Sequence, residues 1–170
     1  FNFRYIDKIL KKDESIEAFM GKRVHEALEF LYDEILSKRL PFIDSIIEKY
    51  HEKWESNWHD RIALVHKDKN IKFYYELGER CLAGYYRSYA PFKQSVIGTE
   101  VEFIFSLNNT NDYIFKGIVD RIDHDGNGNY EIHDYKSGKR AMSFNQAKKD
   151  KQLALYQIAL EQNYNNIKSV

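Results

Sequence analysis

The chemistry of this chain is concentrated in residues 117–139, which read GIVDRIDHDGNGNYEIHDYKSGK. Asp120 precedes the sequence Asp-Gly-Asn-Gly at 125–128, which is typical of a hairpin turn, and Asp134 and Lys136 follow it. A hairpin centred near Asn127 sets Asp120 opposite Asp134. Two facing carboxylates repel each other unless a proton, a basic group or a cation relieves the repulsion. Carboxylate oxygens beside a lysine favour Mg²⁺ or Mn²⁺ over zinc as that cation.

Side chains alternate between the two faces of a strand, and this alternation predicts the face on which each aspartate lies. Asp120 shares a face with Ile118 and Ile122, and Asp134 shares one with Ile132. We therefore expect both aspartates on the core side of the hairpin, where a charge without a partner is costly. The alternative is an ordinary hairpin edge that carries surface charges.

The same hairpin almost satisfies the calcium-loop pattern, through Asp123, Asp125, Asn127, Gly128 and Asp134. Its flanks have the pattern of strands, whereas an EF-hand needs helices, and the twelfth position holds Asp in place of a bidentate Glu. A glycine-rich turn explains these residues without any ligand, so we favour the turn.

Helices are predicted before the hairpin. Apolar residues recur at three- and four-residue spacing from Ser15 to about Leu36, with Ser15 as the N-cap. A second helical pattern follows Leu40-Pro41 and runs through Trp58, and a third covers residues 73–89. Residues 59–70 between them are polar and irregular, which is typical of a connection.

Apolar residues then recur at every second position, which predicts strands over 96–107 and 113–123 with a turn at 108–111. After the hairpin, Ser143 and Gln146 have the spacing of a capping box, and a helix is expected from there to about Asn163. Residues 167–170 have the character of the first step of another strand. This order of elements predicts an α/β or α+β fold with a mixed sheet.

Length and composition limit the number of domains, the kinds of binding site and the cellular compartment that we expect. A chain of 170 residues is expected to form one domain, and its 26 basic and 26 acidic residues create no global positive field, so any nucleic-acid binding must come from local patches. The single cysteine, Cys81, excludes an internal disulfide and a four-cysteine site and suits a reducing compartment. No long apolar run or signal peptide is present, so we expect a cytoplasmic protein without membrane contact. Both ends are abrupt, as in an excised fragment.

Other polar residues have ordinary explanations when taken singly. His25 lies four residues after Gly21 on the first predicted helix, and an isolated histidine at such a place is usually structural. Gln152 and Tyr156 lie four apart on the last helix, where an amphipathic edge explains them. Glu100 and Glu102 alternate on the first strand, either as second-shell carboxylates behind a metal site or as solvent-exposed charges.

Taken in order, these pieces resemble a family. The motifs Gly21-x-x-x-His25, Gly117-Ile-Val-Asp120, Ile132-His-Asp134-Tyr135-Lys136 and Gln152-x-x-x-Tyr156 are similar to those of PD-(D/E)XK nucleases of the RecB-like branch. That branch includes the nuclease domains of bacterial helicase-nucleases and the CRISPR-associated Cas4 nucleases. The resemblance implies a restriction-endonuclease-like core with a mixed central sheet flanked by helices. It also implies a single nuclease domain over 1–170, truncated at both ends, with a helical insertion at 38–95.

The resemblance also implies roles for individual residues. His25, Asp120, Asp134 and the backbone carbonyl of Tyr135 would bind Mg²⁺ or Mn²⁺. Asp120, Asp134 and Lys136 would be catalytic, with Lys136 orienting or polarising the attacking water. Gln152 and Tyr156 would contact the scissile strand. Some relatives hold an iron-sulphur cluster on four cysteines, a set that this chain lacks.

The function that these expectations describe is a metal-dependent DNA nuclease, an exonuclease by the branch it resembles. Its setting would be DNA repair, recombination or CRISPR-type DNA processing, with a helicase subunit or domain as a partner. The alternative is a non-catalytic nucleic-acid-binding module of a larger helicase-nuclease assembly.

Overall fold

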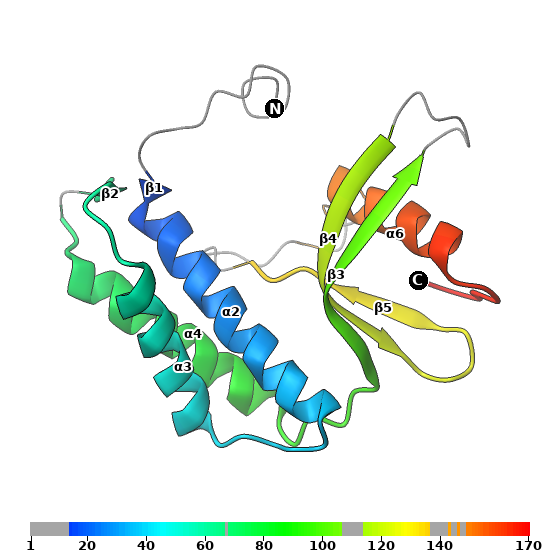
Figure 1. Cartoon of the computed structure of the whole chain (residues 1–170), viewed down its shortest axis with the longest axis horizontal. Helices are drawn as coiled ribbons and strands as arrows, with labels where there is room; N and C mark the ends of the chain where they lie inside the picture. Colours follow the sequence, from blue (N-terminus) through cyan, green and yellow to red (C-terminus); the bar gives the residue numbers. More distant parts are fainter. Residues whose placement is uncertain (1–13, 67, 107–113, 137–142, 144–145, 147–148) are drawn as a thin grey trace. The chain divides into compact units, whose positions relative to one another are not determined.

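The computed structural model of the chain describes residues 14–66, 68–106, 114–136, 143, 146 and 149–170. In chain order its elements are β1 (Glu14–Ser15), α2 (Ile16–Leu36), α3 (Ile43–Asn57), β2 (Ile62–Ala63), α4 (Ile71–Tyr89), β3 (Val96–Ser106), β4 (Ile114–His124), β5 (Tyr130–His133) and α6 (Lys151–Asn163) (Figure 1). This succession confirms the α+β class predicted from the sequence.

Two compact units divide the chain. The first comprises Phe1–Leu28 and Phe42–Ser88, and the second comprises Glu29–Pro41 and Tyr89–Val170. Helix α2 contributes residues to both. The expected single nuclease domain with an insertion at 38–95 stays a prediction.

The first unit is built from α3, α4 and the first part of α2. Ser15 caps α2 as predicted, because its Oγ accepts a hydrogen bond from the Ala18 amide at 3.2 Å. Tyr50 of α3 is fully buried, and its hydroxyl donates to the carbonyl of Tyr75 at 3.1 Å. The apolar stripe predicted for these helices forms their core, with Ile16, Phe19, Met20, Val24, Ile46, Trp54, Tyr74 and Leu82 all buried.

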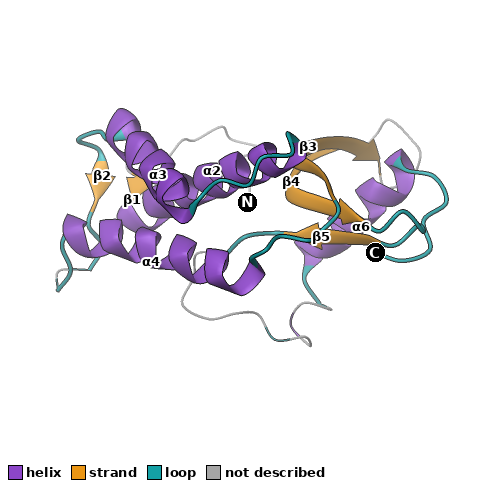
Figure 2. Cartoon of the chain, turned by 90° about the horizontal axis from the view of Figure 1, so that it is seen from below, coloured by secondary structure: helices purple, strands orange, loops and turns teal. Residues whose placement is uncertain are grey.

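The first unit also contains a small parallel sheet that was not predicted from the sequence. Glu14 pairs with Ile62 and Ser15 with Ala63, which joins β1 to β2 (Figure 2). The prediction of an irregular connection over 59–70 is therefore wrong at β2. A strand of two residues is too short to show any period, so only the pairing reveals it.

In the second unit, β3, β4 and β5 form an antiparallel sheet in that order, which confirms the predicted meander (Figure 1). The turn predicted at 108–111 lies outside the described residues. Helix α6 packs on the sheet, where Phe103, Phe105 and Val119 meet its buried Tyr156, Ala159 and Leu160. The helix approaches closely at Gly117, where a Cβ would lie 3.1 Å from Cε1 of Tyr156.

Helix α6 begins later than predicted. The capping box exists, because the Ser143 amide donates to Oε1 of Gln146 at 2.9 Å and the Gln146 amide donates to Oγ of Ser143 at 3.4 Å. The helix nevertheless starts at Lys151, after Asp150, whose carboxylate accepts from the amides of the second and third helical residues. The sequence offers two N-caps, and Asp150 begins the helix that packs on the sheet.

The end of the described chain lies beside β5. Asn129 forms a parallel bridge with Ser169, and the Tyr130 amide donates to the Ser169 carbonyl at 2.9 Å. The sequence predicted the first step of another strand at residues 167–170, and the structure has this single isolated bridge there, outside the named strands. Among the described residues, no helix is both long and apolar enough to span a membrane.

Candidate active site

The hairpin turn between β4 and β5 is held by Asp125. Its carboxylate accepts hydrogen bonds from the Asn127 amide at 2.7 Å and from the Asn129 side chain at 2.6 Å, and the two glycines take positive φ angles of 80° and 94°. These bonds, led by that of Asn129, lower the pKa of Asp125 to about 2. The carboxylate therefore serves the turn, which supports the turn over a calcium loop.

The turn sets the register that was expected. Arg121 pairs with His133 and Ile122 with Ile132, and the pairing ends there, with Asp120 and Asp134 as the next residue on each side. The Tyr135 amide donates to Oδ2 of Asp120 at 2.5 Å, which brings the Tyr135 backbone beside that carboxylate.

Lys136 and two residues of α6 form a connected group with Asp134. The ammonium of Lys136 forms an ion pair with Asp134 and lies 3.4 Å from Oε1 of Gln152. The amide of Gln152 donates to Oδ1 of Asp134 at 3.3 Å and to the hydroxyl of Tyr156 at 2.7 Å. Residues predicted from two separate motifs thus form one connected group.

Tyr156 closes this group against β4. Its hydroxyl donates to the carbonyl of Ile118 at 2.6 Å. Burial raises the pKa of the Tyr156 hydroxyl, and the charges of Asp134 and Asp120 add to this effect. The hydroxyl therefore stays protonated at neutral pH and remains a donor.

The predicted core-side placement of the aspartates is only half correct. Ile122 is fully buried, but Ile118 is 43% exposed, and Asp120 between them is half-buried. The side chain of Asp134 is 13% exposed. The carboxylates thus lie at the edge of the core, where solvent and a substrate can reach them.

The remaining predicted residues lie on other elements. His25 is a half-buried residue of α2 in the first unit. Glu102 of β3 forms an ion pair with Lys116 at 2.7 Å, on an exposed part of the sheet. Glu100 of β3 stands in register opposite Asp120, and an oxygen of its carboxylate lies within 4.8 Å of one of Asp120.

A buried charged network beside the site was missed from the sequence. Arg121 is fully buried, lies 4.2 Å from the ring centre of Tyr32, and donates to Asp123 at 3.0 Å and to Nε2 of His133 at 2.5 Å. Arg121 and Asp123 alternate on β4, and His133 faces Arg121 on β5. The available signal was a basic and an acidic residue two apart on a strand, which share a face. The network joins the two strands that carry Asp120 and Asp134.

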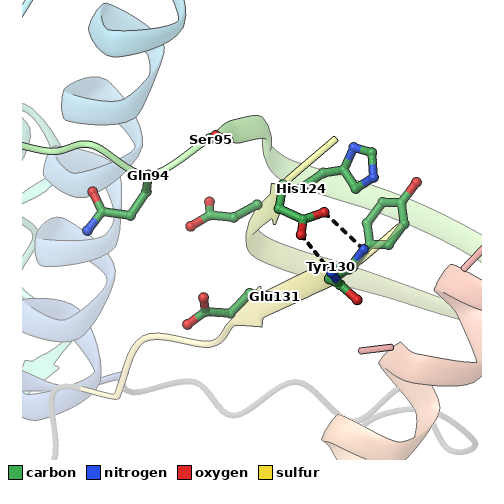
Figure 3. Close-up of a pocket in the computed structure, with 8 residues that line it drawn as sticks. Gln94, Ser95, His124, Tyr130 and Glu131 are labelled. Carbon is green, nitrogen blue, oxygen red and sulfur yellow. Dashed lines mark hydrogen bonds between the residues drawn. The ribbon is translucent and has the colours of Figure 1, made fainter. Parts of the chain in front are cut away.

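A pocket of about 240 Å³ opens near the turn, with Gln94, Ser95, Asp123, His124, Asp125, Asn129, Tyr130 and Glu131 around it (Figure 3). His124 and Tyr130 stack there with ring centres 4.3 Å apart. None of Asp120, Asp134 and Lys136 lines this pocket, so it is separate from the group described above.

The donors at the candidate site suit a hard divalent cation. Glu100 of β3, Asp120 of β4 and Asp134, which directly follows β5, all offer carboxylate oxygens, the ligands that Mg²⁺ and Mn²⁺ prefer. The oxygens of Glu100 and Asp120 lie within 4.8 Å of each other, and a bound cation relieves the repulsion between such carboxylates. The residues present therefore fit a divalent metal.

Comparison with known proteins gives the family. The model of the PD-(D/E)XK nuclease superfamily matches residues 1–169. No curated protein and no solved structure matched the chain. Nucleases of this superfamily hydrolyse phosphodiester bonds with divalent metals, and the facing aspartates with Lys136 supply the donors for that chemistry. On the strength of a family match that spans nearly the whole sequence, the chain belongs to the PD-(D/E)XK nuclease superfamily.

Proposed function

We propose that this protein is an Mg²⁺- or Mn²⁺-dependent deoxyribonuclease that acts as an exonuclease of the RecB-like branch. The observation that supports the proposal best is that Asp134 and Lys136, which follow β5, form one connected group with Gln152 and Tyr156 of α6. Asp120 of β4 lies beside this group and accepts a hydrogen bond from the Tyr135 amide. DNA repair, recombination or CRISPR-type processing in the cytoplasm, with a helicase as partner, is the setting we propose.

Asp120 and Asp134 would hold the cation, together with His25 and the carbonyl of Tyr135. A bound cation supplies Lewis-acid stabilisation of the phosphate and lowers the pKa of a water molecule. The Tyr135 amide, which donates to Asp120, fixes the orientation of that carboxylate.

Lys136 would orient the attacking water and offset charge on the phosphate. Its ammonium is held between Asp134 and Gln152, and half of its side chain is exposed, so it can exchange these partners for a substrate. Gln152 and Tyr156 would contact the scissile strand from the first turns of α6. The Tyr156 hydroxyl donates to the Ile118 carbonyl and accepts from the Gln152 amide, so it would also hold Gln152 in position.

The first test is substitution of Asp120 and Lys136. Asp120→Asn keeps an oxygen that accepts from the Tyr135 amide but removes the charge, so we expect cleavage of linear DNA to fall by about 10³-fold or more with the fold intact. Lys136→Ala should have a comparable effect. The matched control is Lys116→Ala, which removes an exposed lysine paired with Glu102 and should leave the cleavage rate unchanged.

Gel assays in Mg²⁺, Mn²⁺ and EDTA, with circular dichroism as the folding check, give the measurement. Wild-type rates in Asp120→Asn, or full activity in EDTA, would exclude the metal-dependent mechanism. Linear DNA degraded while circular DNA survives would support an exonuclease. DNA binding without cleavage under all three conditions would instead identify a non-catalytic binding module.

A further inference from the structure

Glu100 has an unusual backbone. Its φ angle is 45°, a left-handed conformation that L-residues with a side chain rarely adopt. The other non-glycine residues with positive φ in the described part of the chain, Lys38, Phe92 and Asn166, lie outside helices and strands, whereas Glu100 lies in the middle of β3. A local strain of this kind persists only where the surroundings impose it.

The strained residue stands opposite a proposed metal ligand. Thr99 pairs with Arg121 and Val101 with Val119, so the intervening position sets Glu100 against Asp120. Their carboxylates come within 4.8 Å of each other, an arrangement that like charges on facing strands disfavour.

Two neighbouring residues of α2 hold the strands at this point. The hydroxyl of Thr99 donates to Asp33 at 2.6 Å, and the guanidinium of Arg121 lies over the ring of Tyr32. Thr99 and Arg121 are the register pair next to Glu100 and Asp120. The helix thus anchors both strands beside the strained position, which keeps Glu100 in place against the repulsion.

Glu102, two residues further along β3, does not have the positive φ angle of Glu100 and serves as a comparison. It alternates with Glu100 along β3, but it forms an ion pair with Lys116 at 2.7 Å, and its side chain is 47% exposed. Glu100 and Glu102 therefore serve different purposes, although the sequence pattern treats them alike.

We propose that Glu100 binds the divalent cation directly, as a carboxylate ligand on the side of Asp120 away from Asp134. This inference rests on the proposed function and goes beyond the supporting role that the sequence suggested for Glu100. Glu100, Asp120 and Asp134 then form a row of three carboxylates across three neighbouring chain segments, with Asp120 in the middle.

Calorimetric titration of the metal-free full chain with Mn²⁺ tests the inference without relying on activity. Glu100→Gln should weaken Mn²⁺ binding by about tenfold or more, as loss of one anionic ligand does. Glu102→Gln is the matched control and should bind Mn²⁺ like the wild type. Asp120→Asn serves as the reference for loss of a metal ligand.

Thermal unfolding in EDTA separates a ligand from a merely structural residue. Because Glu100→Gln removes a like charge beside Asp120, the melting temperature of the metal-free variant should equal or exceed that of the wild type. Wild-type Mn²⁺ affinity in Glu100→Gln, or a clear fall in its metal-free melting temperature, would overturn the inference. If Glu100→Gln binds normally while Asp120→Asn does not, only this inference fails; if the wild type neither binds Mn²⁺ nor cleaves DNA, the proposed function fails with it.

Discussion

Individual carboxylates in this protein have distinct tasks although they lie close in sequence. Asp125 accepts the hydrogen bonds of the hairpin turn, Asp123 pairs with the buried Arg121, and Asp120 and Asp134 lie at the edge of the core. The difference comes from the donors that surround each group. A carboxylate that accepts several local N–H groups stabilises a turn, whereas one that faces another carboxylate is suited to a cation.

The pKa of Asp125 leads to a prediction about acid stability. Its ordinary value is 3.8 and hydrogen bonds lower it to about 2 in the folded chain, so the stabilisation is present above pH 3.8 and is lost as pH falls toward 2. Asp125→Ala should therefore unfold more easily than the wild type at pH 6, and the difference should shrink toward pH 2. Urea titrations at pH 6, 4 and 2.5 measure this, and a difference that is constant over these pH values would contradict the assignment.

The buried Arg121 explains why the strands that carry the site keep their register. An arginine without access to water is tolerated because Asp123 balances its charge, His133 accepts a hydrogen bond and Tyr32 offers its ring face. A shift of β5 by one residue would move His133 to the other face of the sheet and would separate Asp134 from Asp120.

At the scale of elements, close helix packing depends on particular glycines. In the first unit, Gly78 of α4 lies against Tyr50 of α3, where an added Cβ would lie 2.2 Å from the tyrosine hydroxyl oxygen. The ring of Tyr50 is fully buried and packs against Trp54 and Tyr75, so it has little room to move.

Gly78→Ala should therefore destabilise the protein by about 1–3 kcal/mol through overpacking. Gly84 on the same helix is the matched control, since nothing lies within 4 Å of its added Cβ. Gly84→Ala should stabilise the protein by about 0.5–1 kcal/mol, because alanine favours the helix interior. Chemical denaturation of both variants measures the two values, and equal effects at both positions would contradict the packing argument.

The whole molecule balances 26 basic against 26 acidic residues, so DNA is not attracted by a global field. The row of carboxylates at the candidate site should repel phosphates until a cation is bound. DNA affinity is thus expected to depend on the metal as much as on the basic residues.

Lys136→Ala, which should not cleave, allows this to be measured by fluorescence anisotropy with linear DNA. We expect Mn²⁺ to tighten binding by about tenfold relative to EDTA, since it converts a repulsive site into an attractive one. The double variant Lys136→Ala with Asp120→Asn should show a smaller gain. Equal affinities in Mn²⁺ and EDTA for the single variant would contradict the expectation.

The sequence by itself determined the helices of the first unit, the three-stranded meander and the hairpin that lies between Asp120 and Asp134. Each of these follows from local signals, namely apolar periodicity and a turn whose residues permit one register. It also placed Gln152 and Tyr156 on the helix that reaches the site.

Only the tertiary structure decided which acidic and basic residues are buried and where the chain is strained. The alternation of side chains along β3 gave Glu100 and Glu102 the same role. In the folded chain an oxygen of Glu100 lies within 4.8 Å of one of Asp120, whereas Glu102 forms an ion pair with Lys116. The burial of Arg121 likewise needs Tyr32, Asp123 and His133 together. These choices depend on residues far apart in the chain, which no local pattern records.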